Sequence, residues 1–330
     1  MSRPGILCIS MDAEHFWGVH DSQKIQQFGP AILAGKQAAK EMLELLKAYE
    51  IHGTWAVVGF LFADNKEEIL KYLPAQLPQY TNPMRSGYRL LESLGEDESC
   101  DPIFYGKSLI EAIRKTPYQE IASHTFSHYY CNEPGQTLET FKDDLDAALR
   151  IAVKADCRIT SIVFPRNECR SDYIEKCFEM GFTAYRGQEE NWIYRIKLVP
   201  VKRMFRLLDA YLPLTGHNGY PPPIPDEKNM VNITGSRFFR PYSMELAGLE
   251  GLKLARIKGQ MRQAAQKGLV FHLWWHPHNM GFNPQKSLEQ VREILDYYQS
   301  LKQQYGFLSR NMQEIARGDF GSPSRHEKGG

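Results

Sequence analysis

Short apolar runs alternate with longer amphipathic segments along most of this chain. Most of the runs lack the apolar–polar alternation of a half-exposed strand, which is typical of parallel strands buried on both faces. We therefore predict strands at residues 5–11, 54–62, 120–123, 161–165, 182–186 and 268–275.

The segments between these runs have the spacing of amphipathic helices. In residues 34–49, apolar side chains recur at intervals of three and four, which predicts a helix with one buried face. Further helices are predicted at residues 107–115, 137–154, 172–180, 245–267 and 288–304. Ser287 and Gln290 have the spacing of a capping box at the start of the last helix, which is predicted to stop at Gly306. Gly181 and Gly268 are predicted as C-terminal caps.

Alternating strands and helices predict an α/β fold with a parallel sheet, open or closed. The 330 residues are enough for one α/β barrel of ~250 residues with additions, so we expect a single domain over residues 1–330. Two segments break the rhythm and are predicted as insertions, at about 64–106 and 187–235. The second contains "GYPPPIP" and is predicted to be a loop, and loops of such length are usually binding loops or lids.

Composition narrows the class of protein. With 40 basic and 39 acidic residues and no basic tract, the chain is not expected to bind nucleic acid. No stretch approaches the ~20 apolar residues of a transmembrane segment, and the start lacks a signal-peptide pattern. The six cysteines include no CxxC motif, which favours reduced thiols. We expect a cytoplasmic protein, with peripheral attachment to a membrane left open.

Polar side chains with catalytic potential follow the first and third predicted strands. Asp12 and Glu14 are two residues apart, so both project from one side if the strand persists. His124 and His128 could reach one ion if the segment between them makes a helical turn. Each pair alone could instead be an ordinary turn cap or polar contact. A carboxylate with two imidazoles, however, has the layout of a catalytic zinc site.

Two later strands end in similar side chains. Arg166 could be a surface cation, or it could hold a carboxylate ionised and in a fixed orientation. In "VFHLWWHPHN", strand alternation places His272 and His276 on one face, and a histidine there can donate a proton near neutral pH. The alternative is an aromatic core with incidental histidines. Ligands bind at the carboxyl ends of strands in parallel sheets, so we favour one joint site.

The motifs "SMDAEH", "HTFSH", "FPRN" and "WWHPHN" occur in the order seen in the polysaccharide deacetylase family, the NodB-homology carbohydrate esterases. The segment "HGTWAVVGFLF" also resembles the second strand of that family, and the resemblance spans residue 5 to about residue 280. It implies a distorted (β/α) barrel that binds one divalent metal ion, with zinc as the expected ion.

The resemblance also implies residue roles. It makes three side chains the metal ligands, namely Glu14, His124 and His128. Asp12 would be the catalytic base, Arg166 would orient Asp12, and His276 would be the catalytic acid in preference to His278. The chain departs from the family in having Asp-x-Glu in place of adjacent aspartates, and P-R-N in place of R-P-P-Y.

These roles predict an enzyme that removes an N-acetyl or N-formyl group from a sugar. The ion would lower the pKa of a water molecule to about 7, Asp12 would take its proton, and His276 would protonate the departing amine. The expected substrate is a polysaccharide or a nucleotide- or lipid-linked sugar of surface polysaccharide synthesis. The alternatives are a hydrolase of a cyclic amide or ureide, and a non-catalytic barrel that binds carbohydrate.

Four further residues are candidates for substrate binding. Arg237 and Arg240 in "SRFFRP" could clamp a phosphate group, or they could be an ordinary pair of surface cations. Trp275 and His278 lie in the last motif and are expected to contact the sugar. The sequence makes no prediction of the oligomeric state.

Overall fold

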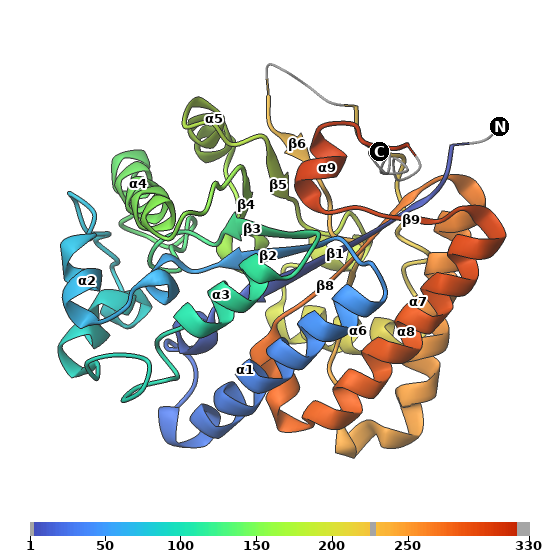
Figure 1. Ribbon diagram of the computed structural model, residues 1–330, viewed down its shortest axis with the longest axis horizontal. Coiled ribbons are helices and arrows are strands. Elements are labelled where there is room, and N and C mark those ends of the chain that lie inside the picture. The colour runs from blue at the N-terminus through green and yellow to red at the C-terminus, as the bar shows by residue number, and fades with distance from the viewer. Residues whose placement is uncertain (1–2, 225–228, 322–330) are drawn as a thin grey trace, which may run out of the picture.

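The protein is described by a computed structural model that covers residues 3–224 and 229–321. Its centre is a curled, entirely parallel sheet of nine strands in the order β6-β5-β4-β3-β2-β1-β8-β7, with β9 beside β1 (Figure 1). The strands are β1 (Ile6–Ala13), β2 (Gly53–Val57), β3 (Gln119–Ser123), β4 (Ser161–Val163), β5 (Ala184–Arg186), β6 (Val231–Asn232), β7 (Arg237–Phe238), β8 (Val270–Trp275) and β9 (Leu308–Ser309). Within the described ranges β6 and β7 do not pair, so the barrel stays open there.

Helices surround this sheet (Figure 1). They are α1 (Ile25–Ala48), α2 (Lys66–Lys71), α3 (Lys107–Lys115), α4 (Leu138–Lys154), α5 (Ser171–Glu179), α6 (Val199–Tyr211), α7 (Glu250–Lys267), α8 (Pro284–Tyr305) and α9 (Met312–Ala316). The predicted distorted (β/α) barrel is therefore confirmed. All six predicted strands and all six predicted helices are present, although the second strand ends at Val57 and α1 begins at Ile25.

The predicted capping box of the last helix is wrong. Helix α8 begins at Pro284 with Asn283 as its N-cap, so Ser287 lies inside the helix. The Ser287 hydroxyl accepts a hydrogen bond from the backbone N–H of Tyr242 at 3.1 Å and is not a capping group. Gly268 is confirmed as the C-cap of α7, with a left-handed φ of 67°, and α8 ends at Gly306, with a φ of 68°. Gly181, with φ 92°, directly follows Met180, the C-cap of α5.

The two predicted insertions contain short helical elements. The first includes α2 and two 3₁₀ turns. In the second, predicted to be a loop, the 3₁₀ turn Trp192–Arg195 and the 13-residue helix α6 are present. Pro200 lies in the first turn of α6, where a missing backbone N–H costs no intrahelical hydrogen bond. Pro200 is therefore compatible with the helix.

Strand alternation sets the position of the polar groups. In β1, Leu7, Ile9 and Met11 pack with the surrounding helices, whereas Ile6 and Cys8 belong to a separate apolar cluster inside the barrel. Side chains from α9 complete this inner cluster near the start of the strands. Further along β1 the inner positions become polar, which places the site at the carboxyl ends of the strands.

Candidate active site

Asp12 and Arg186 form the most extensively bonded pair of the site. Arg186, the last residue of β5, donates from Nη1 to Asp12 Oδ1 at 2.8 Å and from Nη2 to Asp12 Oδ2 at 2.7 Å. Both side chains are almost completely buried. Burial alone would raise the pKa of Asp12, but the Arg186 guanidinium and His276 hold this pKa well below its usual range. Asp12 is therefore an ionised carboxylate with a fixed orientation.

The prediction that Arg166 orients Asp12 is wrong. Arg166 donates to Asp21 at 2.8 Å and to Glu133 at 2.8 Å, and its guanidinium lies 4.0 Å from the ring centroid of Tyr130. Its backbone is left-handed, with φ 60°, in the turn that follows β4. These contacts keep the Arg166 side chain away from Asp12.

The P-R-N motif reaches Asp12 through its asparagine. Asn167 Oδ1 accepts a hydrogen bond from Arg186 Nε at 3.0 Å, which leaves both terminal nitrogens of Arg186 for Asp12. On another side, the Ser10 hydroxyl accepts from Arg186 Nη1 at 2.9 Å and contacts His272 Nε2 at 2.7 Å. His272 is fully buried, and burial lowers its pKa to about 3. It is therefore a neutral imidazole that holds the Ser10 hydroxyl in place.

Glu14, His124 and His128 come together as predicted. Glu14 Oε2 lies 3.1 Å from His124 Nε2 and 2.9 Å from His128 Nε2. One ligand atom from each side chain lies within 4.8 Å of the others, and all three residues are buried. The structure thus forms a three-residue cluster with the composition of a metal site.

The loop of the two histidines differs from the expected helical turn. Residues 124–128 are irregular, and Thr125 and His128 have left-handed φ values of 64° and 59°. Buried Asp144 of α4 fixes this loop, because its carboxylate accepts from the backbone N–H of Phe126 at 2.7 Å and from the Ser127 hydroxyl. Burial raises the pKa of Asp144 to about 6.

The donor set suits a divalent cation. His124 Nδ1 lies 2.8 Å from the carbonyl oxygen of Val163, so a neutral His124 donates there and directs the Nε2 lone pair at Glu14. In that state the contact is unfavourable unless a cation lies between the imidazole and the carboxylate. Burial also lowers the pKa of His128, which favours the neutral imidazole that a metal requires.

His276 lies beside both carboxylates. Its Nε2 is 3.4 Å from Asp12 Oδ2 and 3.6 Å from Glu14 Oε1, and Asn279 Nδ2 lies 3.3 Å from its Nδ1. Burial alone would lower the pKa of His276, but the Glu14 and Asp12 carboxylates outweigh burial and raise it. The His276 side chain is 24% exposed, more than those of Asp12 and Glu14, so it can contact a substrate.

His278 and Trp275, the two residues of the last motif that were predicted to contact the sugar, point in different directions. His278 is buried against the site, with its Nε2 3.8 Å from Glu14 Oε1, and burial lowers its pKa to about 4. Trp275 points to the outer face of β8 and packs against Phe239, so the prediction that it contacts substrate is wrong. Its neighbour Trp274 faces inward, where its ring lies 4.2 Å from the Arg186 guanidinium.

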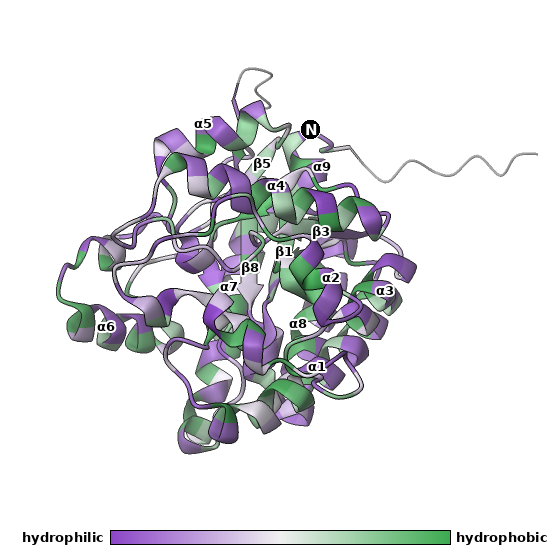
Figure 2. Cartoon of the chain, turned by 90° about the vertical axis from the view of Figure 1, so that its left-hand side faces the viewer, coloured by the Kyte–Doolittle hydropathy of each residue, from purple (hydrophilic) through white to green (hydrophobic). Residues whose placement is uncertain are grey.

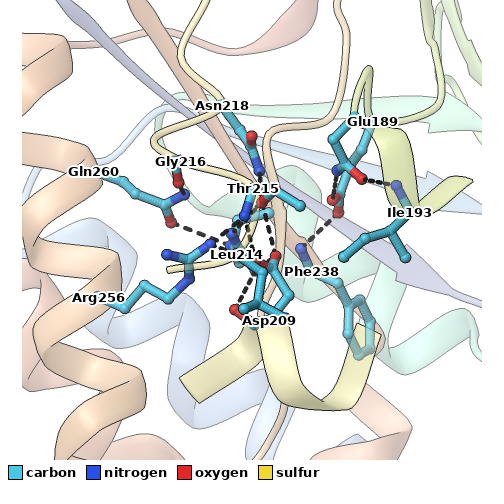
Figure 3. Close-up of polar contacts among 12 residues, drawn as sticks. Glu189, Ile193, Asp209, Leu214, Thr215, Gly216, Asn218, Phe238, Arg256 and Gln260 are labelled. Carbon is cyan, nitrogen blue, oxygen red and sulfur yellow. Dashed lines mark hydrogen bonds and ion pairs between the residues drawn. The ribbon is translucent and has the colours of Figure 1, made fainter. Parts of the chain in front are cut away.

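The two arginines predicted to clamp a phosphate are not equivalent. Arg237 is buried and donates to Asp209 Oδ2 at 2.7 Å, and Arg256 donates to the other oxygen of Asp209. Figure 3 shows Asp209 at the centre of this network, together with Thr215 and Gln260. Arg237 is therefore occupied by a structural ion pair, and the prediction that it clamps a phosphate is wrong.

Arg240 belongs to a small neighbouring recess that is partly open to solvent. Arg206, Tyr194, Phe238 and Glu189 also line this recess. The ring centroid of Phe238 lies 5.5 Å from that of His276, so the recess adjoins the candidate acid.

Sequence reasoning missed Arg186, Asn167 and Trp274. Arg186 could have been predicted from the sequence, because it lies at the end of a predicted strand, as do the pair Asp12 and Glu14 and the two histidines. Asn167 has no comparable signal, since its role depends on the left-handed turn that directs Arg166 outward. Trp274 follows from the same alternation that places His272 and His276 on the inner face of β8.

No family model and no curated protein matches the chain. Among solved structures, a protein described as a polysaccharide deacetylase from Mycobacterium smegmatis aligns with 13% identity over 96% of this chain and 91% of that chain, at a TM-score of 0.60. A protein described likewise from Pseudomonas aeruginosa PAO1 has 13% identity, coverages of 94% and 89%, and a TM-score of 0.54. PuuE allantoinase has 12% identity, coverages of 94% and 89%, and a TM-score of 0.55. The chain therefore has the distorted (β/α)-barrel fold that these three proteins share.

Proposed function

We propose that this protein is a metal-dependent hydrolase that removes an N-acetyl or N-formyl group from a sugar. One observation carries the proposal: His276 Nε2 lies 3.4 Å from the ionised Asp12 and 3.6 Å from Glu14 of the Glu-His-His cluster. A base, an acid and a metal site with three protein ligands are the groups that hydrolysis of an amide requires.

Glu14, His124 and His128 would hold the ion, and zinc is expected because carboxylate and imidazole are among its usual ligands. When bound, the ion supplies a Lewis acid that lowers the pKa of a water molecule. Asp12 accepts the proton of the attacking water. Arg186 keeps Asp12 ionised, and its two parallel hydrogen bonds fix both carboxylate oxygens.

His276 acts in the second half of the reaction. An amine leaves poorly unless its nitrogen is protonated, so the acid must carry a proton near neutral pH. The raised pKa of His276 meets this requirement. Trp274 and Phe238 flank its ring, with centroid distances of 5.7 and 5.5 Å, and limit its orientation.

The proposed substrate is linked to an anionic carrier, such as a nucleotide or a lipid phosphate. Support comes from the recess beside His276, in which neither Arg206 nor Arg240 forms an ion pair with a carboxylate of the described residues. Burial and the positive charge of Arg206 lower the pKa of Arg240, so the two guanidinium groups repel each other. An anion bound between the two guanidinium groups would relieve that repulsion.

A second candidate activity is hydrolysis of a cyclic ureide, which the shared fold with PuuE allantoinase favours. The same base, acid and metal ligands could serve a ring amide. The two activities differ in product: an acyl sugar releases acetate or formate, whereas a ureide ring opens without losing a fragment.

The test is to measure acetate release from N-acetyl sugars and ring opening of allantoin with zinc-loaded protein, using Asp12→Asn as the control. Acetate release that is lost in Asp12→Asn supports the proposal. Ring opening alone supports the second candidate. Stoichiometric metal with neither activity on any sugar or ureide tested would favour the carbohydrate-binding barrel.

A further inference from the structure

Exposed apolar side chains are concentrated in one segment of the second insertion. Eight of the nineteen exposed large apolar side chains in the described ranges lie between residues 192 and 214. We call them the α6 patch: Trp192, Leu198, Val199, Met204, Leu207, Leu208, Leu212 and Leu214. Each is between 37% and 63% exposed. Clusters of this kind usually mark a surface that binds something.

The patch is an ordered surface. Leu207 and Leu208 lie three and four residues after Met204, so all three side chains share the outer face of α6. The Trp192 ring packs on Phe205 with centroids 5.2 Å apart, and its indole N–H donates to the carbonyl oxygen of Leu214 at 3.4 Å. Figure 2 shows α6 at the edge of the molecule, with apolar and polar segments alternating along it.

The same segment is strongly basic. Between residues 191 and 208 there are five cationic side chains and no acidic one, namely Arg195, Lys197, Lys202, Arg203 and Arg206. Within the described ranges none of the five forms an ion pair with a carboxylate, whereas nearby Asp209 is buried between Arg237 and Arg256. The apolar face is therefore bordered by cationic side chains that form no ion pair within the described ranges.

We propose that the α6 patch binds the surface of an anionic phospholipid membrane. Leucine and tryptophan side chains on one face of a helix with lysine and arginine beside them are the pattern of a helix that lies in the headgroup region. Each cation near an anionic surface strengthens binding about fivefold. No helix in the described ranges is long and apolar enough to cross a membrane, so the contact concerns the surface alone.

Charge argues against a second copy of the chain as the occupant. A two-fold contact between two α6 patches would bring identical clusters of cations together, which costs free energy. An anionic lipid surface instead offers apolar chains to Leu207 and Leu208 and phosphate groups to Lys197 and Arg203. One kind of occupant thus satisfies both the apolar and the charged side chains.

Helix α6 lies close to the candidate active site, so membrane binding through it would also position that site. The insertion begins directly after Arg186, the residue that holds Asp12. It also supplies Tyr194 and Arg206 to the recess beside Phe238 and His276. Binding through α6 would therefore place the rim of the candidate active site next to the lipid headgroups.

Vesicle flotation tests the proposal without any measurement of activity, so its failure is distinguishable from failure of the proposed function. The full chain should bind vesicles of phosphatidylcholine with phosphatidylglycerol, bind vesicles of phosphatidylcholine alone weakly, and lose binding at high salt. Leu207→Ser with Leu208→Ser should weaken binding at least about tenfold. Lys197→Gln with Arg203→Gln should weaken it about 25-fold.

Val153→Ser is the matched control, because Val153 is 72% exposed on α4 and outside the patch, and this variant should bind as the wild type does. Leu207 and Leu208 are 37% and 40% exposed, so thermal unfolding of each variant is measured beside vesicle binding to establish that the variant is folded. The absence of binding to anionic vesicles, or equal binding by wild type and both double variants, would overturn the proposal. A wild-type dimer that Leu207→Ser with Leu208→Ser dissociates, without vesicle binding, would assign the patch to a second copy and also overturn it.

Discussion

Arg186 and Asp12 lie on strands that are not neighbours, yet they form two parallel hydrogen bonds of 2.8 and 2.7 Å. Strands β4, β3 and β2 separate β5 from β1 in the sheet, so the sheet must curl for the two side chains to meet. The pair therefore depends on the curvature of the barrel, and it links that curvature to the charge and orientation of the candidate base.

We predict that Arg186→Lys lowers kcat about 10- to 100-fold, the effect of losing one hydrogen bond between charged groups. An ammonium group cannot donate the two parallel hydrogen bonds of a guanidinium. The bound metal should remain stoichiometric, because Arg186 contacts none of the three proposed ligands. Steady-state kinetics and metal analysis of the purified variant check both expectations.

Arg166→Gln is the control for this prediction, since Arg166 contacts Asp21 and Glu133 instead of Asp12. Its kcat should stay within about twofold of wild type, because ion pairs near the surface contribute little. A loss as large as that of Arg186→Lys would show that the role of Arg186 has been misassigned.

The metal ligands can be tested separately from the acid and the base. His124→Ala should remove both the bound ion and the activity, because the cluster would retain only two ligands. His278→Gln is a suitable comparison: His278 is buried beside Glu14, at 3.8 Å, but is not a proposed ligand. Zinc retained at one equivalent by His124→Ala, or lost by His278→Gln, would contradict the ligand assignment.

The pH dependence of the rate follows from two opposite shifts. The lowered pKa of Asp12 keeps the base ionised over the working range, whereas the raised pKa of His276 keeps the acid protonated near neutrality. The rate should fall at high pH as His276 loses its proton, and at low pH as the base or the ligands gain one. A bell-shaped profile of kcat/KM is expected, with apparent pKa values that belong to the coupled site.

His276→Ala and Asp12→Asn separate the two halves of the reaction. Both variants should keep the ion, and both should lose most of the rate on an N-acetyl sugar. On an activated aryl acetate, whose leaving group needs no proton, His276→Ala should recover a large part of its rate while Asp12→Asn should not. Equal losses of His276→Ala on both substrates would rule out its role as the acid.

The recess beside His276 makes a prediction about substrate charge. Arg206→Gln with Arg240→Gln should raise KM for a phosphate-linked N-acetyl sugar at least about tenfold, since each lost charge-assisted hydrogen bond is worth about 1.5–3 kcal/mol. The KM for an uncharged N-acetyl sugar should not change. Arg158→Gln removes the charge of an exposed arginine that does not line the recess, and should affect neither substrate. Equal changes for both substrates would remove the case for an anion site.

Much of the fold and part of the site follow from local patterns. The apolar runs and helical spacings predicted six strands and six helices, and the rule that ligands bind at the carboxyl ends of strands brought Asp12, Glu14 and the two histidines together. Strands β6, β7 and β9 contain two residues each, too few for any pattern to identify.

Two of the errors concern arginines whose contacts the local sequence does not determine. Arg166 and Asn167 are adjacent in the sequence, but left-handed φ values of 60° and 55° separate their directions. Arg237 and Arg240 look alike in the sequence, and only buried Asp209 distinguishes them. Such partners lie far away along the chain, so a one-dimensional pattern contains no signal for them.

The central place of β1 has a consequence for biosynthesis. Its residues Ile6–Met11 pair with Val270–Trp275 of β8, so β1 is synthesised long before this partner strand. Until then one edge of β1 has no partner, and an unpaired edge is open to aggregation. A chain that stops before β8 would also lack His276. A product that ends before β8 can therefore retain neither the β1–β8 pairing nor the proposed proton donor, so it cannot act as a weak enzyme.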